Sequence, residues 1–274
     1  MDVDIESRKT LKTICILLLL VPLFSLHLSK FSVQQKKKIY YTSSMDYLEL
    51  ISGSFRPLFA EMIFIKGILG LPEEAPDRMS YFLNLFNTSI DLDPKLINAY
   101  FLGGVVVPTG KEEVTTGIKF LKKGMALNPS EWRIPFWIGF NYLELGVYSK
   151  VIKYYRMASD LPGSPPYLKT NLAFLYYKAN RPQEGLLYLK GLCNFIKDNH
   201  ILKIMKNKIK WLEKIVNLEK KIEEYREMHG VWPLNLDDLV KRKLIKEIPD
   251  DPFGKGYYLE KDLLSGIPKV RSKF

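Results

Sequence analysis

The feature that most constrains the fold is a pattern that occurs twice between residues 134 and 195. The first copy has a small residue at Gly139 and an aromatic residue at Tyr142, and the second copy has Ala173 and Tyr176 at the same places. The interval is the same for both pairs (173 − 139 = 34 and 176 − 142 = 34). A fixed period of this length, with small and aromatic residues at set positions, is typical of stacked helix–turn–helix units.

The second half of each copy keeps the same interval. Val151 is followed by Gly185 one period later (185 − 151 = 34), and small residues allow two antiparallel helices to approach closely. Gly146 and Asn180 are also one period apart (180 − 146 = 34), and both can adopt the positive φ that a turn between two helices requires. The pattern therefore predicts two consecutive helical hairpins.

With these features the chain resembles the tetratricopeptide repeat family. The resemblance implies an all-α fold, a helical solenoid, and binding of peptides or partner proteins as the usual role. The chain departs from the family at the position that normally holds Trp, where Pro135 and Lys169 occur, and the second copy lacks a closing Pro at Lys197.

Two further repeats are expected before these copies. A divergent one spans residues 59–94, and the next, residues 95–129, is one residue longer than the period (129 − 94 = 35). We place the additional residue in the loop at 108–110, where a surface insertion does little harm. Residues 42–70 are predicted to form a helix broken near 53–57, and its lack of a polar face predicts that other helices sandwich it.

Residues 198–230 are predicted to form one long helix with an apolar stripe. The stripe consists of Ile201, Ile204, Trp211, Ile215, Leu218, Ile222 and Tyr225, with Lys208 interrupting it. One interpretation is a coiled-coil seam that forms a homodimer. The other, which we favour, is a helix that covers the end of the last repeat, because a solenoid needs a polar-faced cap.

Residues 231–274 are predicted to form a small subdomain. A strand at 257–259 is expected to pair with 267–270 across the turn at Ser265-Gly266. The fold class is thus an all-α solenoid with a long capping helix and a small C-terminal β-hairpin. The segment also resembles the region after the long helix of major pseudopilins, and the residues that carry the resemblance are Tyr225, Gly230, Pro233, Leu239, Asp251-Pro252-Phe253-Gly254 and Tyr258. This resemblance implies a link to envelope fibres or secretion machinery.

The first 40 residues contain an apolar run at 13–28 with Arg8, Lys9 and Lys12 before it and Lys30 after it. Its length suits a single membrane span, and no small-x-small cleavage motif follows. We therefore favour an uncleaved anchor over a cleaved signal peptide. A short N-terminal tail most often stays in the cytoplasm, so we expect the repeats to face the periplasm. The predicted divisions are an anchor and basic linker at 1–40, repeats at 41–197, a capping helix at 198–230 and the subdomain at 231–274.

Charge and chemistry limit the possible functions. The net charge is +11, but the basic residues are scattered and few are Arg, so nucleic-acid binding is not favoured. The three histidines have no acidic or cysteine partner at ligand spacing, and the two cysteines, Cys15 and Cys193, form no metal or redox motif. The sequence predicts no enzyme, no metal and no cofactor.

The family resemblance also implies a binding site, because the first helix of each repeat lines the inner surface. The matching positions are Asn98, Phe101, Val105, Arg133, Phe136, Phe140, Tyr167, Phe174 and Tyr177. Each of these side chains could instead belong to the core. Together they predict an apolar, aromatic groove that suits an amphipathic helix or an extended peptide. The chain's own helix at 46–69 could fill the same groove.

The leading hypothesis is a membrane-anchored scaffold that recruits or assembles another protein or peptide at the cell envelope. The first alternative is a structural or dimerising module whose groove is filled by its own helix. The second is a basic protein that binds anionic lipid or nucleic acid, and it rests on charge alone.

Overall fold

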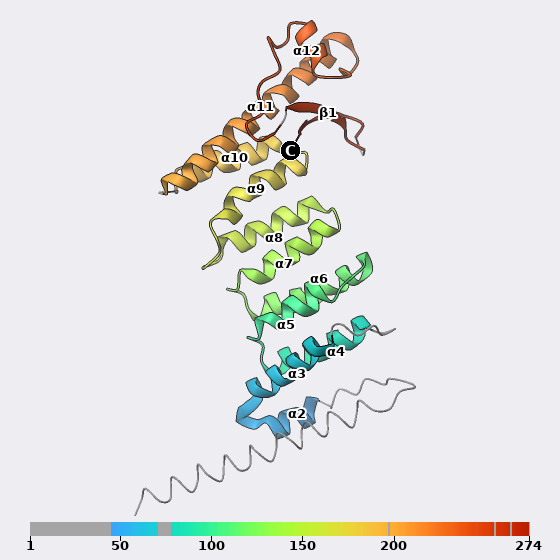
Figure 1. Cartoon of the computed structure of the whole chain (residues 1–274), viewed down its shortest axis with the longest axis vertical. Helices are drawn as coiled ribbons and strands as arrows, with labels where there is room; N and C mark the ends of the chain where they lie inside the picture. Colours follow the sequence, from blue (N-terminus) through green and yellow to red (C-terminus); the bar gives the residue numbers. More distant parts are fainter. Residues whose placement is uncertain (1–44, 71–77, 197, 255, 264, 274) are drawn as a thin grey trace, which may run out of the picture.

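The structure is a computed structural model, and it describes residues 45–70, 78–196, 198–254, 256–263 and 265–273. It is mostly helical, with a small two-stranded antiparallel sheet near the C-terminus, which confirms this part of the predicted fold class (Figure 1). The predicted membrane anchor and the basic linker lie outside the described residues. Within the described ranges no helix is both long and apolar enough to cross a membrane.

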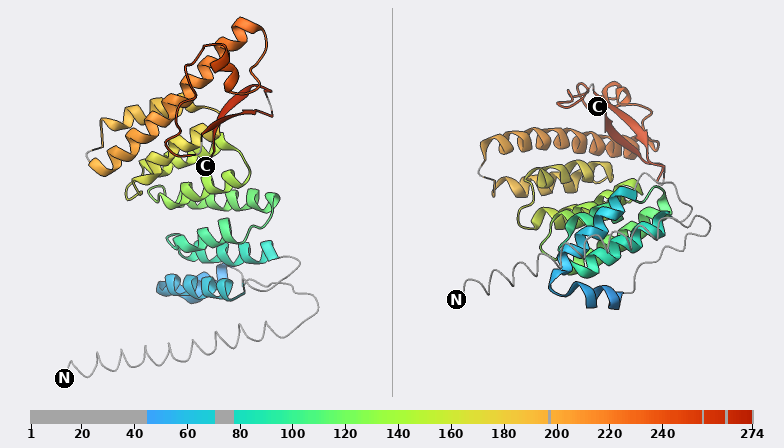
Figure 2. Two further views of the ribbon diagram at one scale, coloured as in Figure 1. Left: turned by 45° about the horizontal axis from the view of Figure 1, so that its top comes forward. Right: turned by 60° about the horizontal axis from the view of Figure 1, so that its bottom comes forward.

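Consecutive helices pack against one another and form a stack along the long axis of the molecule (Figures 1 and 2). In chain order the helices are α2 (Met45–Ser52), the 3-10 turn η1 (Gly53–Phe55), α3 (Arg56–Gly70), α4 (Arg78–Leu92), α5 (Ile97–Phe101), the π-turn η2 (Leu102–Val106), α6 (Lys111–Leu127), α7 (Arg133–Glu144), α8 (Tyr148–Asp160), α9 (Tyr167–Lys178), α10 (Pro182–Cys193), α11 (Asn199–His229) and α12 (Asp237–Lys241). Strands β1 (Tyr257–Lys261) and β2 (Pro268–Ser272) follow.

Small residues at the repeated positions allow the helices to pack closely. A Cβ atom on Gly139 would lie closer than 3.0 Å to the ring of Tyr155. A Cβ atom on Gly117 would lie equally close to the carbonyl oxygen of Gly104. The turn residues Gly146 and Asn180 have φ of 71° and 60°, as the sequence predicted. The repeated pattern therefore reflects real close contacts between neighbouring helices.

The first helix of the unit at 95–129 contains a wide turn, and the loop that follows it (107–110) is one residue longer than the corresponding loops at 145–147 and 179–181. The structure shows the wide turn η2 inside the first helix, in which the amide N–H of Val107 donates to the carbonyl of Leu102 over 2.9 Å. A π-turn holds one residue more than an α-helical turn, and such turns occur mostly singly within α-helices. The longer loop agrees with the predicted position of the additional residue at 108–110, and the wide turn is a separate feature of this helix.

The same turn leaves one carbonyl without a main-chain donor. The residue four positions after Gly104 is Pro108, which has no N–H, and the N–H of Thr109 donates instead to the Glu113 carboxylate (2.8 Å). The buried amide of Asn141, on α7, donates to the Gly104 carbonyl at 2.7 Å. A side chain of the next helix therefore satisfies a buried acceptor that the wide turn and the proline leave open.

The long helix α11 covers the last helix pair. The Asp198 carboxylate accepts hydrogen bonds from the N–H groups of His200 and Ile201, and Gly230 (φ 71°) ends the helix. Most of the predicted stripe is buried within this chain, against α9 and α10 on one side and the C-terminal segment on the other. The buried members of α11 are Met205, Trp211, Leu212, Ile215, Leu218, Ile222 and Tyr225. Ile204 is exposed.

The predicted β-hairpin is present. Leu259 pairs with Val270 and Tyr257 with Ser272 in an antiparallel register. The alternate residues Pro268, Val270 and Ser272 of β2 are buried, and β2 packs against α11. The hairpin therefore folds back onto the capping helix.

The prediction that residues 42–70 are sandwiched between helices is wrong for α3 among the described residues. Its buried side, formed by Ala60, Ile63 and Gly67, packs against α4. Its other side is open, with Ile65 51% and Leu69 75% exposed. The reason is that α3 lies near the end of the stack, where among the described elements only the short helix α2 and the turn η1 lie beyond it (Figure 1).

Candidate partner-binding face

The residues proposed for partner binding fall into three groups by exposure. We call the surface that they form on α5, η2, α7 and α9 the candidate face. Asn98, Phe140 and Tyr167 are exposed. Phe101, Val105, Arg133, Phe136 and Phe174 are half-buried, and Tyr177 is buried. The candidate face is therefore partly surface and partly core.

The half-buried aromatic residues of α5 and α7 form ring pairs. Phe101 lies 5.1 Å, between ring centroids, from Trp137 of α7. Phe136 stacks on Tyr155 of α8 at 4.9 Å and also meets Trp132 at 6.1 Å. These contacts hold the rings in fixed positions, so the middle of the candidate face is a preformed apolar surface.

Two side chains of the candidate face reach solvent directly. Phe140 is 37% exposed on α7, and Tyr167 is 52% exposed at the start of α9. Tyr167 also lies close enough to Tyr155 to contribute to its raised pKa, although burial is the larger cause. Phe140 and Tyr167 are therefore the two aromatic side chains of the candidate face that are open to a partner.

The one cationic residue among the proposed positions is already paired. Arg133 donates from Nε and Nη2 to the two carboxylate oxygens of Glu131, at 2.7 and 2.8 Å. The bonds raise the pKa of Arg133 and lower the pKa of Glu131. A bidentate pair of this kind leaves little charge free for a ligand carboxylate. The middle of the candidate face is therefore suited to an apolar partner.

The end of the candidate face, on α9, is covered by the C-terminal part of the chain. Trp211 of α11 lies 4.7 Å edge-on from Tyr177 and 6.4 Å, stacked, from Phe174. Phe253 meets the other side of Trp211 at 5.9 Å. These three aromatic contacts cover the side of α9 that carries Phe174 and Tyr177.

Hydrogen bonds also hold the C-terminal part of the chain against α9. The Tyr177 hydroxyl accepts a bond from the backbone N–H of Ser272 at 2.9 Å, and Arg271 lies over the Tyr177 ring while donating to the side chain of Asn180 at 2.7 Å. Burial raises the pKa of the Tyr177 hydroxyl. The Ser272 hydroxyl donates in turn to the carboxylate of Asp251. Strand β2 is therefore fastened to α9.

The lysine that interrupts the stripe of α11 also belongs to this contact. The Lys208 ammonium group donates to the carbonyl of Thr170 at 3.1 Å and to the side chain of Asn171 at 3.0 Å. Burial lowers its pKa. Lys208 thus joins α11 to α9 through polar contacts, which explains a charge in an otherwise apolar stripe.

Sequence reasoning did not find the covering residues Trp211, Phe253 and Ser272. The sequence signal for this contact is Trp211 itself, a large aromatic side chain in the apolar stripe of α11. The stripe predicts a capping helix but does not predict which residues it contacts. The alternative that the helix at 46–69 fills the groove is not what the structure shows, since α3 packs on α4 at the end of the stack. The segment that covers part of the candidate face comes from the opposite end of the chain.

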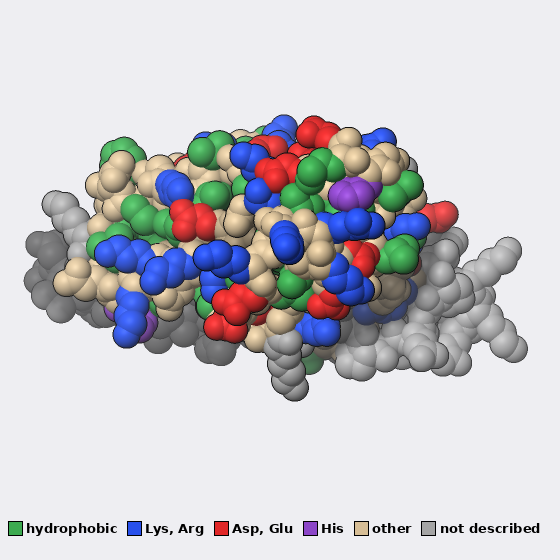
Figure 3. Space-filling view, turned by 90° about the horizontal axis from the view of Figure 1, so that it is seen from above, with side chains coloured by type: hydrophobic (Ala, Val, Ile, Leu, Met, Phe, Trp, Pro, Cys, Tyr) green, Lys and Arg blue, Asp and Glu red, His purple; other side chains and the backbone are tan. Residues whose placement is uncertain are grey.

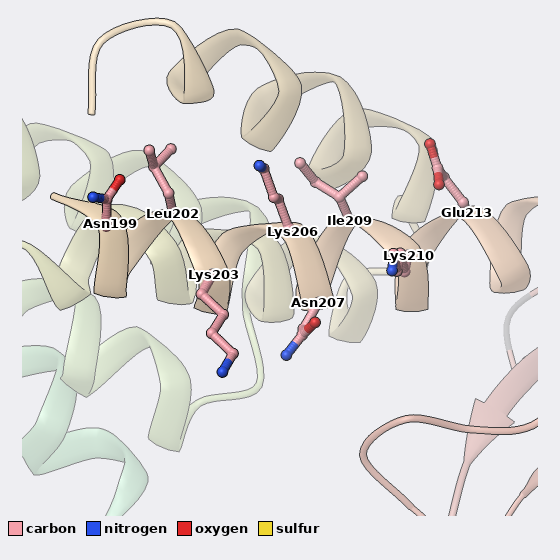
Figure 4. A pocket seen from close by; sticks show the side chains of 8 residues that line it. All are labelled: Asn199, Leu202, Lys203, Lys206, Asn207, Ile209, Lys210 and Glu213. Carbon is pink, nitrogen blue, oxygen red and sulfur yellow. The ribbon is translucent and has the colours of Figure 1, made fainter. Parts of the chain in front are cut away.

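A second surface feature lies on α11. A shallow groove of about 470 Å³ follows its first half and is lined by Asn199, Leu202, Lys203, Lys206, Asn207, Ile209, Lys210 and Glu213 (Figure 4). All eight residues belong to one helix, so this groove is an open, basic surface of α11. In the described part of the chain no group of His, Cys, Asp or Glu side chains could hold a metal ion.

The chain matches no model of a known protein family, and no curated protein matches it either.

Proposed function

We propose that the chain is a membrane-anchored scaffold built from tetratricopeptide-like helical repeats, and that the middle of the candidate face binds a partner protein or peptide. The supporting observation is the exposed, preorganised aromatic surface formed by Phe140 and Tyr167 with the ring pairs around Phe136. Its rings are held by packing, and its one arginine is neutralised by Glu131. Such a surface suits the apolar side of an amphipathic helix or an extended apolar peptide.

The proposal also includes the location of the protein in the cell. The apolar run at 13–28 anchors the chain in the cytoplasmic membrane, and the helical stack stands in the periplasm. The resemblance of residues 225–258 to the region after the long helix of pseudopilins supports a role in the assembly of envelope fibres or secretion machinery. No reaction and no cofactor is part of this proposal.

A pair of substitutions in the full chain tests the binding surface. We expect Phe140→Glu combined with Tyr167→Glu to abolish co-purification of the partner from detergent-solubilised membranes, because two charges would have to be buried in an apolar contact. Both side chains are exposed, so the variant should keep its circular dichroism spectrum and its unfolding midpoint.

The matched control is Met157→Glu combined with Leu187→Glu. These side chains are equally accessible but lie on α8 and α10, the second helices of their pairs. The control variant should recover the partner as the wild type does. Equal recovery by both double variants would contradict the proposed site.

A further inference from the structure

The end of the stack opposite α11 presents a concentration of exposed apolar side chains. We call this surface the end face. It consists of Leu50, Ile51, Phe55, Leu58, Ile65, Ile68 and Leu69 on α2, η1 and α3. Soluble proteins rarely leave so many large apolar side chains close together in water without a binding role.

The apolar residues of the end face that lie on α3 recur at helical spacing along one side of the helix. Leu58, Ile65 and Leu69 are separated by seven and four residues, which places them on one side of α3. The opposite side of the helix, with Ala60 and Ile63, is packed on α4. The helix is thus apolar on both sides, although the described helices cover only one.

The other end of the stack, at α11, exposes charged side chains to water. The outer side of α11 carries the exposed residues Lys203, Lys206 and Lys210, and Lys and Arg side chains are spread over this end of the molecule (Figure 3). A terminal helix of a repeat array needs such a polar outer side to remain soluble. On the outer side of α3 the only exposed charged residue is Glu61, and the rest of the end face is apolar, so we infer that a different environment covers it.

The sequence places a lipid bilayer within reach of the end face. The run proposed to span the membrane ends at Leu28, and α2 begins at Met45 after a short connection (45 − 28 = 17). A connection of this length spans at most about 60 Å when fully extended. A surface held this close meets the bilayer at a high effective concentration. The intervening segment contains Lys30 and the run Lys36–Lys38, which favour anionic headgroups.

We propose that the end face lies in the boundary between the headgroups and the acyl chains of the membrane that anchors the chain. The inference rests on the anchorage given under the proposed function. An apolar helix side buried at this depth is the usual mode of interfacial helices. In this arrangement α2 and α3 contact the bilayer, and the stack extends away from it towards α11 and the C-terminal segment at its other end (Figure 2).

A lipid-quenching experiment on the full chain tests this arrangement. Cys15 and Cys193 are replaced by Ser, and single cysteines are introduced by Leu69→Cys or, as the control, by Leu234→Cys, whose native side chain is 88% exposed near α12. Each variant is labelled with an environment-sensitive fluorophore and reconstituted in vesicles of phosphatidylcholine and phosphatidylglycerol, with or without a doxyl-labelled lipid.

We expect the label at residue 69 to shift to shorter wavelength in vesicles and to be quenched by the doxyl lipid, while the label at residue 234 keeps its spectrum in water. Adding Ile65→Glu to the Leu69→Cys variant should reduce the quenching, because a charge at this depth is costly. Adding Leu187→Glu, on α10, should leave it unchanged.

Other outcomes contradict the inference in distinguishable ways. A label at residue 69 that stays unquenched in a chain that resists carbonate extraction overturns the membrane contact and leaves the anchor intact. Extraction of the chain by carbonate contradicts the anchorage and the inference together. Disulfide-linked dimers through residue 69 without lipid quenching would assign the end face to a second copy of the chain instead.

Discussion

The candidate face differs between α7 and α9, although the two helices hold corresponding places in the repeated pattern. Phe140 and Phe174 are one period apart (174 − 140 = 34), yet Phe140 is exposed to solvent and Phe174 lies under Trp211. The difference does not arise within the repeats. It arises because the C-terminal segment folds back over the last helix pair, and no comparable segment of the described chain covers α7. Equivalent positions in a repeat array can therefore have different surroundings, one open to solvent and one covered by a distant segment of the chain.

The largest expected effect comes from removing the covering side chain. We expect Trp211→Ala to lower the free energy of unfolding by about 3–5 kcal/mol, because a buried aromatic side chain leaves a cavity between α9, α11 and Phe253. Urea denaturation followed by circular dichroism measures the change. A loss no greater than that of Phe140→Ala would show that the covered part of the candidate face is not a packed core.

A smaller effect is expected at Gly117 of α6 and Gly185 of α10, because the helix pairs that contain them differ in how closely the two helices approach. A Cβ on Gly117 would collide with the carbonyl oxygen of Gly104, whereas a Cβ on Gly185, in the corresponding position near α9, would lie 3.1 Å from the nearest carbonyl oxygen, that of Ala173. We expect Gly117→Ala to destabilise the protein by about 1–3 kcal/mol, and Gly185→Ala to cost less.

Thermal unfolding measures which of the two variants, Gly117→Ala or Gly185→Ala, loses more stability. The control is Gly191→Ala on α10, where an added Cβ meets no atom within 4 Å, and alanine should stabilise the helix by about 0.5–1 kcal/mol. The reverse order of the first two variants would mean that the helix pair beside α9 is the tighter one.

Alkaline pH should weaken both parts of the candidate face through buried tyrosines. Burial raises the pKa of Tyr155 to about 12, well above the ordinary value for a tyrosine, and the pKa of Tyr177 is also raised. The folded state therefore holds these protons more tightly, so its stability is unchanged below about pH 10 and falls as the pH rises towards 12.

The contribution of Tyr155 can be separated by substitution. At about pH 11 its share of the loss is about 1.4 kcal/mol, and Tyr155→Phe should lose that much less between pH 8 and 11 than the wild type. Unfolding curves at several pH values measure the difference. An identical pH profile in the variant would contradict the burial of this hydroxyl.

The smallest effect on stability is expected at the exposed position. Phe140→Ala should lower the free energy of unfolding by only about 1 kcal/mol, because Phe140 is 37% exposed whereas Trp211 is 3% exposed. Partner binding should nevertheless fall, as titration of the solubilised chain with its captured partner would show. A large loss of stability would instead show that Phe140 is packed against its neighbours as Phe174 is packed against Trp211.

The sequence predicted the helical class, the turns at Gly146 and Asn180 and the pairing of a strand at 257–259 with 267–270, because these features depend on local spacing and backbone preference. It did not predict the closure over α9. That contact joins Tyr177 to Ser272, 95 residues apart, and depends on how a long helix is oriented in space. Periodicity shows which side of a helix is apolar, but not which distant segment covers it.

The bond between Asn141 and Gly104 has a consequence for the evolutionary history of this chain. The wide turn and Pro108 leave the buried carbonyl of Gly104 without a main-chain donor, at a cost of about 1–3 kcal/mol unless a donor is supplied from elsewhere. The amide of Asn141 supplies it from the following unit. Pro108 and Asn141 should therefore be inherited together: descendants of the same ancestor that lack the proline are free to replace the asparagine, and those that keep the proline are expected to retain it.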